Sequence, residues 1–170
     1  MIIYLGSRFD RHAEMEGYAD ILKGWGHEIS SGWHSLNAET KMRDGDPEVA
    51  FNQAIAEQDQ HGIYVCDLFV GFTESPSNPP PGSARGGRHV EFGMALAYNK
   101  LVIAVGPREN VFHYLNEVYN ASLEEWLGFL NGTLWATDLR NILFPLSHSK
   151  GLRVVDSDPE IFKAKGFSRP

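Results

Sequence analysis

Residues 86–107 read GGRHVEFGMALAYNKLVIAVGP, which is a helix signal followed at once by a strand signal. Two glycines can open a helix, and the stretch from there to Asn99 contains no proline, so we predict a helix over about 86–99. The run Leu101–Val105 is wholly apolar and ends at Gly106-Pro107, which predicts a short buried strand. A buried strand directly after a helix is typical of an α/β protein with a parallel sheet.

The same alternation continues on both sides of this stretch. Three further short runs predict strands: Ile2–Leu5, His27–Ser30 and Leu68–Phe72. Helices are expected over about 11–23 with Asp10 as the N-cap, from Asp46-Pro47 onward, and over about 123–130 with Ser122 and Glu125 as a capping box. The pattern therefore predicts a three-layer α/β/α sandwich with a largely parallel sheet of four or five strands.

Composition narrows the class of protein. The chain has 170 residues and is 42% hydrophobic, which suits a globular domain. Its 15 basic and 22 acidic side chains give a net charge of −7, which argues against a binder of nucleic-acid polymers or membranes. Cys66 is the single cysteine, and the N-terminus lacks the features of a signal peptide, so we expect a cytoplasmic protein.

Two acidic residues are candidates for chemistry. Ligands of parallel sheets bind at the carboxyl ends of the strands, and Glu91 lies about one turn into the helix that follows the loop after Leu68–Phe72. The helix dipole there favours an ionised carboxylate, as a nucleophile requires. We expect Val90 and Met94 on the buried stripe of this helix. Asp67 is the second acid, and a carboxylate pair around one pocket suits the cleavage of glycosidic bonds.

Three motifs resemble a known family. Tyr4-Leu5-Gly6-Ser7-Arg8-Phe9, Cys66-Asp67-Leu68-Phe69-Val70-Gly71-Phe72 and Gly-Gly-x-x-x-Glu91-Phe-Gly-Met-Ala-Leu-Ala look like the nucleoside 2-deoxyribosyltransferase family, which includes the 2′-deoxynucleoside 5′-phosphate N-hydrolases. The resemblance covers residues 1–131, taken as one domain. Residues 132–170 are expected to form a C-terminal extension that packs on the domain or in an oligomer contact.

The resemblance implies a Rossmann-like fold and a homodimer or higher oligomer, with no metal and no organic cofactor. It implies cleavage or transfer at the N-glycosidic bond of a (2′-deoxy)nucleoside or its 5′-monophosphate. Glu91 would be the nucleophile that forms a glycosyl-enzyme intermediate, and Asp67 would lie near the leaving base. Asn110 stands where the family commonly has a polar residue that reaches a neighbouring subunit. Gly6, Ser7 and Phe9 would line the pocket.

One departure from the family concerns the 5′-phosphate. Transferases of the family usually carry an aspartate six positions before the nucleophile, where this chain has Arg85. An arginine suits phosphate better than a sugar hydroxyl. The residues that would hold the phosphate are Ser83, Arg85, the amides of Gly86 and Gly87, and Arg88.

Other classes of function remain open or are disfavoured. His12, His89 and His113 stand in no metal-binding spacing, and the chain has neither Gly-x-Gly-x-x-Gly nor a Gly-Lys-Ser/Thr loop. A phosphoribohydrolase-like or NAD-cleaving glycosidase is the alternative enzyme. A nucleotide-binding module without turnover is the alternative outside enzymes.

Overall fold

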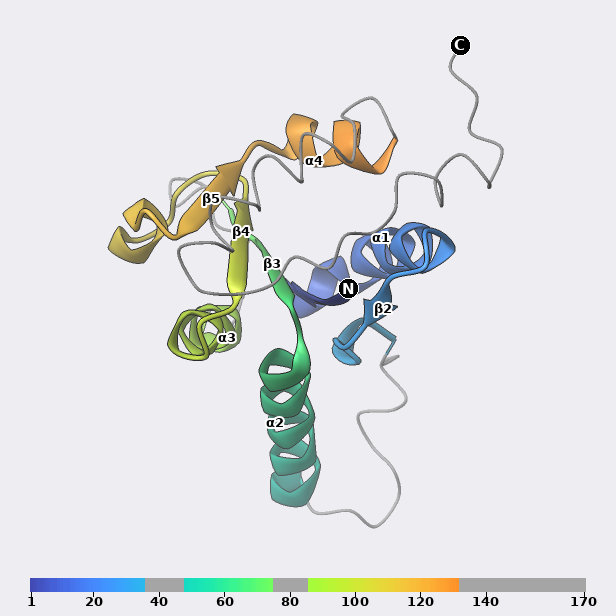
Figure 1. Ribbon diagram of the computed structural model, residues 1–170. Coiled ribbons are helices and arrows are strands. Elements are labelled where there is room, and N and C mark those ends of the chain that lie inside the picture. The colour runs from blue at the N-terminus through green and yellow to red at the C-terminus, as the bar shows by residue number, and fades with distance from the viewer. Residues whose placement is uncertain (36–47, 75–85, 132–170) are drawn as a thin grey trace.

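The computed structural model describes residues 1–35, 48–74 and 86–131. Five strands of this part form one sheet with the order β2-β1-β3-β4-β5, in which every neighbouring pair is parallel (Figure 1). The strands are β1 (Ile2–Gly6), β2 (Glu28–Ile29), β3 (Leu68–Phe72), β4 (Leu101–Val105) and β5 (Val118–Ala121).

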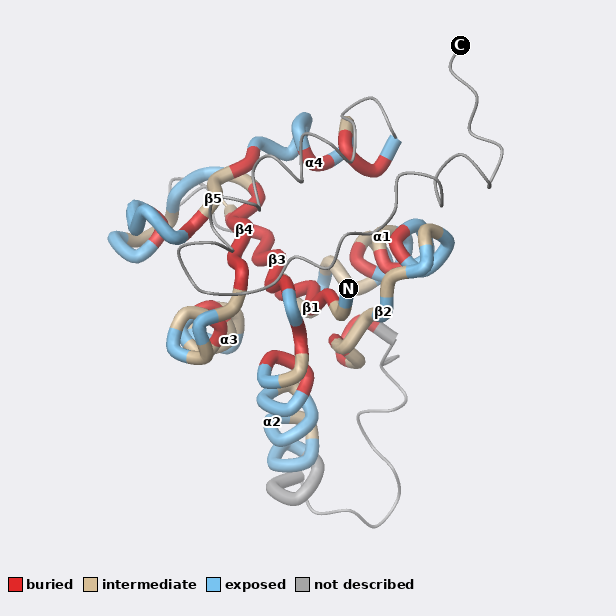
Figure 2. The backbone as a smooth tube through the Cα atoms, viewed as in Figure 1, coloured by how far each residue is buried: buried red, intermediate tan, exposed pale blue. Residues whose placement is uncertain are grey.

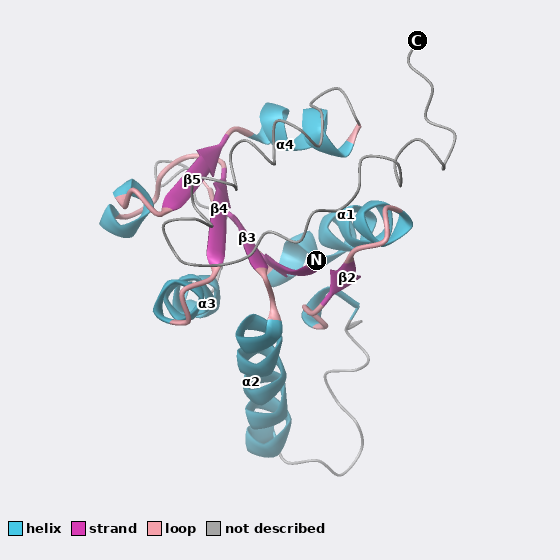
Figure 3. Ribbon diagram, viewed as in Figure 1, coloured by secondary structure: helices cyan, strands magenta, loops and turns pink. Residues whose placement is uncertain are grey.

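Four helices cover the two faces of the sheet: α1 (His12–Gly24), α2 (Glu48–Val65), α3 (Gly86–Ala97) and α4 (Leu123–Leu130). In the described part of the chain, α1 contacts α4 while α2 contacts α3, and Figures 1 and 3 show the two pairs on opposite sides of the strands. Short 3-10 helices are η1 (Phe9–Arg11), η2 (Trp33–Ser35) and η3 (Val111–Tyr114). The chain is a Rossmann-like three-layer α/β/α sandwich, as the sequence predicts.

The core lies along the two central strands that carry no polar side chain. All residues of β3 and β4 are buried, and these strands are red throughout in Figure 2. On the face toward α2, the Tyr4 ring stacks on Phe69 with centroids 5.6 Å apart. Helix α2 approaches closely here because Gly62 has no side chain: a Cβ at this position would lie 2.6 Å from the carbonyl oxygen of Ser30.

Most predicted elements are confirmed. Strands β3 and β4 have the predicted bounds, and the capping box of α4 makes both of its hydrogen bonds, between Ser122 and Glu125. The predicted cap of α1 is wrong, because Asp10 lies within η1 and Arg11 occupies the N-cap without a side-chain bond. Strand β5 was not predicted, since its polar residues Tyr119 and Asn120 interrupt the apolar pattern.

The buried face of α3 also differs from the prediction. Val90 is 58% exposed, whereas Phe92 and Ala95 are 5% and 0% exposed. The helix is therefore rotated so that Phe92 packs against Phe69 of the sheet, with ring centroids 6.2 Å apart. This rotation also brings Glu91 toward the sheet, which decides the geometry of the site.

Several predictions fall outside the described residues: the loop over 75–85, the start of α2 at Asp46-Pro47 and the extension over 132–170. Within the described residues, no helix combines the length and apolar character needed to cross a membrane.

Candidate active site

The site lies where the chain changes direction across the sheet. From β1 the chain runs to β2 on one side, and from β3 it runs to β4 on the other, so β1 and β3 are adjacent strands with divergent connections. Their carboxyl ends are in register, with Gly6 opposite Gly71. In open parallel sheets, ligands bind outside the carboxyl ends of the strands at such a switch point.

Helix α3 brings the Glu91 carboxyl group to this point. A Cβ built on Gly6 would lie 3.0 Å from Oε2 of Glu91, so the carboxyl group approaches the backbone at the end of β1. Oε1 accepts a hydrogen bond of 3.3 Å from the Tyr4 hydroxyl. Oε2 is buried and has no hydrogen-bond partner among the described residues, so an oxygen is available for a ligand.

A second carboxylate, Asp59 on α2, is close to the same tyrosine. Burial raises the pKa of Asp59, and a hydrogen bond with the Tyr4 hydroxyl lowers it by less. The pKa of Tyr4 is well above its ordinary value because of burial and the charges of Glu91 and Asp59. Since a hydroxyl has one proton to donate, Tyr4 satisfies one of the two carboxyl groups at a time.

The environment raises the pKa of Glu91 to about 8. Burial is the main cause and the negative charge of Asp59 is the second, while the bond from Tyr4 acts in the opposite direction. Our expectation that the helix dipole keeps this group ionised is wrong for the unliganded protein. Glu91 lies beyond the first turn of α3, where the dipole has faded and burial dominates. The carboxyl group therefore holds a proton at neutral pH.

Sequence reasoning missed both Tyr4 and Asp59 as partners of Glu91. A signal for Asp59 was present, because it stands four residues before Ile63 and so shares a helix face with a fully buried residue. An acid on the inward stripe of a helix is a sign of function, since an unpaired carboxylate is costly to bury.

The structure does not bring Asp67 to Glu91. Asp67 precedes β3, so it lies at the amino end of that strand, whereas Glu91 lies at the carboxyl ends of β1 and β3. Its Oδ2 accepts a hydrogen bond of 2.7 Å from the backbone N–H of Ile2. In this chain Asp67 ties the start of β1 to β3.

Beside Gly6 and Gly71 there is a small cavity. It has room of about 10 Å³ for the centre of a water-sized group, and its unfilled space, which includes solvent at its mouth, is about 220 Å³. Its other lining residues are Phe72, Thr73, Arg88, His89, Phe92, Glu109 and His113.

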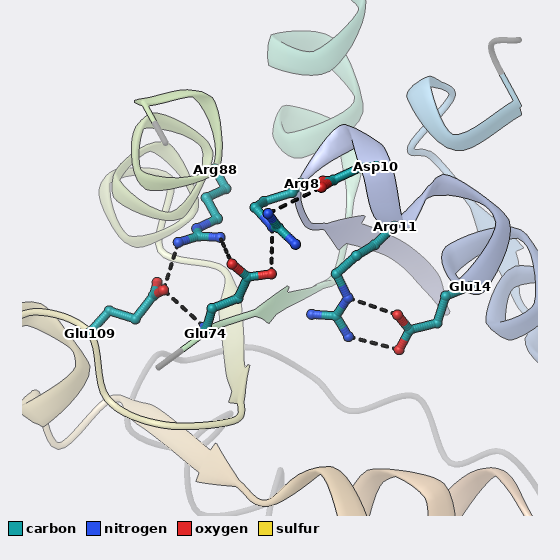
Figure 4. A network of polar contacts seen from close by, with 7 residues as sticks. All are labelled: Arg8, Asp10, Arg11, Glu14, Glu74, Arg88 and Glu109. Atoms are coloured by element: carbon teal, nitrogen blue, oxygen red, sulfur yellow. Dashed lines mark hydrogen bonds and ion pairs between the residues drawn. The ribbon is translucent and has the colours of Figure 1, made fainter. Parts of the chain in front are cut away.

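Two of the lining residues, Arg88 and Glu109, belong to an ion-pair network (Figure 4). Arg88 Nη2 lies 2.6 Å from Glu109 Oε1, and Arg88 Nη1 lies 3.6 Å from Glu74 Oε2. Glu74 also pairs with Arg8, whose Nε is 2.5 Å from Oε1. The side chains of Arg8, Arg88 and Glu109 are all at most 9% exposed. Asp10 also pairs with Arg8, 3.1 Å from its Nη1, so the two arginines of the network face three carboxylates.

The remaining expected residues are spread around this edge. The hydroxyl of Ser7 is buried without a partner among the described residues, and Phe9 stacks on His12 at 5.4 Å. Gly86 and Gly87 are exposed at the start of α3. Ser83 and Arg85 lie outside the described residues.

Asn110 is engaged within its own chain. Its Oδ1 accepts a hydrogen bond of 2.9 Å from the N–H of Phe112 and so caps η3, while its Nδ2 lies 3.4 Å from His89 Nδ1 and 3.4 Å from His113 Nε2. Phe112 itself is 58% exposed. The apolar tip of η3 therefore faces outward.

Comparisons with known proteins bear on the fold. No family model and no curated protein matches the sequence. A CMP N-glycosidase of Clostridium botulinum is 20% identical, with a TM-score of 0.51, over 77% of this chain and 99% of that one. A 2-deoxyribosyltransferase of Bacillus psychrosaccharolyticus is 20% identical, with a TM-score of 0.56, over 81% of this chain and 95% of that one. The chain is thus similar in fold to a nucleotide glycosidase and a deoxyribosyltransferase.

Proposed function

We propose that this protein is an enzyme that cleaves or transfers the N-glycosidic bond of a (2′-deoxy)nucleoside or its 5′-monophosphate. The observation that carries the proposal is the Glu91 carboxyl group, buried beside Tyr4 and Asp59 at the switch point of the sheet. The sequence motifs around Tyr4 and Glu91 support it, as does a fold shared with two enzymes that act on such substrates.

In this proposal Glu91 is the nucleophile. Its proton first passes through the Tyr4 hydroxyl to Asp59. The Glu91 carboxylate then attacks C1′ of the sugar, the bond from C1′ to the base breaks, and the bonding electrons leave with the base, which takes up the proton from Asp59. The positive charge that develops on the sugar favours the ionised form of Glu91. Water resolves the glycosyl-enzyme intermediate in a hydrolase, and a second base resolves it in a transferase.

In this proposal Asp59, and not Asp67, is the acid near the leaving base. The leaving base needs a proton, and an acid with a raised pKa beside the reacting carbon can provide it. Burial raises the pKa of Asp59, and the Tyr4 hydroxyl links it to Glu91. Tyr4 is then a positioning residue that distributes one proton between two carboxyl groups.

A 5′-phosphate would bind at the start of α3. The amides of Gly86 and Gly87 are exposed there, and Ser83 and Arg85 immediately precede them in the sequence. Arg88 is not proposed for this role, because Glu74 and Glu109 already balance its charge. We also propose a homo-oligomer, because Val111, Phe112 and Tyr114 expose apolar surface at η3.

The test is base release from a panel of ribo- and deoxynucleosides, their 5′-monophosphates and NAD, with and without an acceptor base. Free base is followed by chromatography. We expect release from at least one nucleoside or monophosphate, and a loss of at least about 1000-fold in Glu91→Gln. Glu57→Gln is the matched control, because Glu57 is an exposed acid on α2.

Three results would contradict the proposal. The first is no base release from any member of the panel, and the second is full activity in Glu91→Gln. The third is tight nucleotide binding that Glu91→Gln leaves unchanged, without turnover, which would identify a binding module. Cleavage of NAD or ribonucleotides in preference to deoxynucleotides would favour the phosphoribohydrolase-like alternative.

A further inference from the structure

Two residues that line the cavity, Arg88 and His113, have N–H groups that no acceptor among the described residues bonds. Arg88 is 8% exposed, and its Nε and Nη1 are buried without a hydrogen-bond acceptor among the described residues. The 3.6 Å contact from Nη1 to Glu74 is an ion pair longer than a hydrogen bond. Buried N–H groups of this kind are rare and indicate a missing acceptor.

His113 is the second residue of the cavity with an unpaired N–H donor. It is 2% exposed, and its Nδ1 lies 3.1 Å from the backbone N–H of Glu109, which can only donate. Nδ1 must therefore be the acceptor of the ring. Burial lowers the pKa of His113, and the positive charges of Arg88 and Arg108 act in the same direction, so the ring is neutral. A neutral ring with an accepting Nδ1 carries its proton on Nε2.

The neighbour of that Nε2–H group cannot accept it. Asn110 Nδ2 lies 3.4 Å away, and Nδ2 is itself a donor because Oδ1 of Asn110 is bonded to the N–H of Phe112. Two N–H groups thus face each other beside the cavity. The second proton of Nδ2 can bond to Nδ1 of His89, which leaves the His113 proton without an acceptor in the described part of the chain.

The charge of the cavity wall identifies the kind of acceptor. At the cavity the charge of Arg88 is balanced by Glu109, and His113 is neutral; behind them, Arg8 pairs with Glu74 and Asp10. A phosphate dianion in the cavity would meet the carboxylate of Glu109 without a net positive charge to attract it. An uncharged carbonyl oxygen offers two lone pairs, one for an N–H of Arg88 and one for the N–H of His113, and has the size that the cavity admits.

We propose that this cavity binds the exocyclic carbonyl oxygen of the leaving base, through donors on Arg88 and His113. The inference rests on the proposed function, because it places the base beside the Glu91 site at Gly6 and Gly71. The enzyme then prefers oxo bases, such as hypoxanthine, to adenine, whose amino group would add another donor to a wall of donors.

The test compares 2′-deoxyinosine with 2′-deoxyadenosine, whose bases differ in the exocyclic group on C6 and in the hydrogen on N1, as nucleosides and as 5′-monophosphates. We expect kcat/KM to favour deoxyinosine by about tenfold or more, since an unpaired buried donor is costly. His113→Leu should bring the ratio close to one. His113→Gln, whose amide keeps an N–H donor, should retain most of it, and the exposed His61→Leu is the control. The ratio is independent of the fraction of folded protein.

A ratio near or below one in the natural chain would overturn the proposal, as would a ratio that His113→Leu leaves unchanged. Binding of free hypoxanthine and adenine, measured by calorimetry, separates this inference from the reaction. If no nucleoside is cleaved but hypoxanthine binds about tenfold more tightly than adenine, the proposed function fails and the carbonyl site stands. If a nucleoside is cleaved and the two bases bind equally or not at all, the carbonyl site fails and the reaction stands.

Discussion

The Tyr4 hydroxyl donates a hydrogen bond of 3.3 Å to Oε1 of Glu91, although the two residues are 87 positions apart in the chain. This bond lowers the pKa of Glu91 against the effects of burial and of Asp59. In Tyr4→Phe we therefore expect the pKa of Glu91 to rise and kcat/KM at neutral pH to fall, by about tenfold. The measurement is the pH profile of kcat/KM, whose limb near pH 8, where Glu91 loses its proton, should move to higher pH. A profile that keeps its midpoint would contradict the role given to Tyr4.

Replacement of Asp59 should move the same limb in the opposite direction. Asp59→Asn removes the negative charge that raises the pKa of Glu91, so the midpoint should fall. The maximal rate should fall as well, because the proposed proton donor to the leaving base is lost. Glu57→Gln, on the same helix, should change neither quantity. A normal maximal rate in Asp59→Asn would exclude Asp59 as the acid.

Gly6→Ala should disable the site. Its Cβ would lie 2.8 Å from Cζ of Phe69 and 3.0 Å from Oε2 of Glu91, so the ring or the carboxyl group must move. We expect a loss of about 100-fold or more in kcat/KM and a decrease of about 1–3 kcal/mol in the free energy of unfolding. Gly17→Ala is the control, because Gly17 is in α1 with nothing within 4 Å of its Cβ position. Wild-type activity in Gly6→Ala would show that the reaction does not require the Glu91 carboxyl group to lie against the backbone of Gly6.

The raised pKa of Glu91 also predicts how stability depends on pH. The folded protein keeps the Glu91 proton up to a pKa of about 8, whereas the unfolded chain releases it near 4.5. The folded state thus binds more protons between these values, and this group's contribution to stability is lost as the pH rises through the window. Urea denaturation at several pH values should show that the free energy of unfolding falls less steeply in Glu91→Gln. Equal slopes for both proteins would mean that Glu91 is not buried in its protonated form.

The strands were predictable because each is a short apolar run that ends at a turn residue. Leu68–Phe72 and Leu101–Val105 are buried on both faces, so each is a continuous apolar run. Such a run can be recognised in the sequence without knowing which strands and helices pack against it. Strand β5 and the rotation of α3 depend on tertiary contacts. Val90 looks like a core residue, yet Phe92 occupies the inward face, because its larger ring fills the space against Phe69.

The site was predictable only in its central residue. Glu91 stands in a motif, whereas its partners come from β1 and α2 and meet it through folding alone. The sequence suggests Asp67 as a partner because it precedes a central strand. A residue that precedes a strand lies at the amino end of that strand, however, and ligands of parallel sheets bind at the carboxyl ends. The sequence alone predicts that Arg88 binds phosphate, whereas in the structure Arg88 pairs with Glu74 and Glu109.

In the proposed reaction Glu91 forms a covalent bond to the sugar. The most direct test of this bond is mass spectrometry of the chain incubated with a nucleoside that carries fluorine at C2′, which slows the release of the intermediate. We predict one added sugar on the peptide that contains Glu91, with one equivalent of base set free, and neither in Glu91→Gln. An adduct on Asp59, or base release that continues in Glu91→Gln, would contradict it.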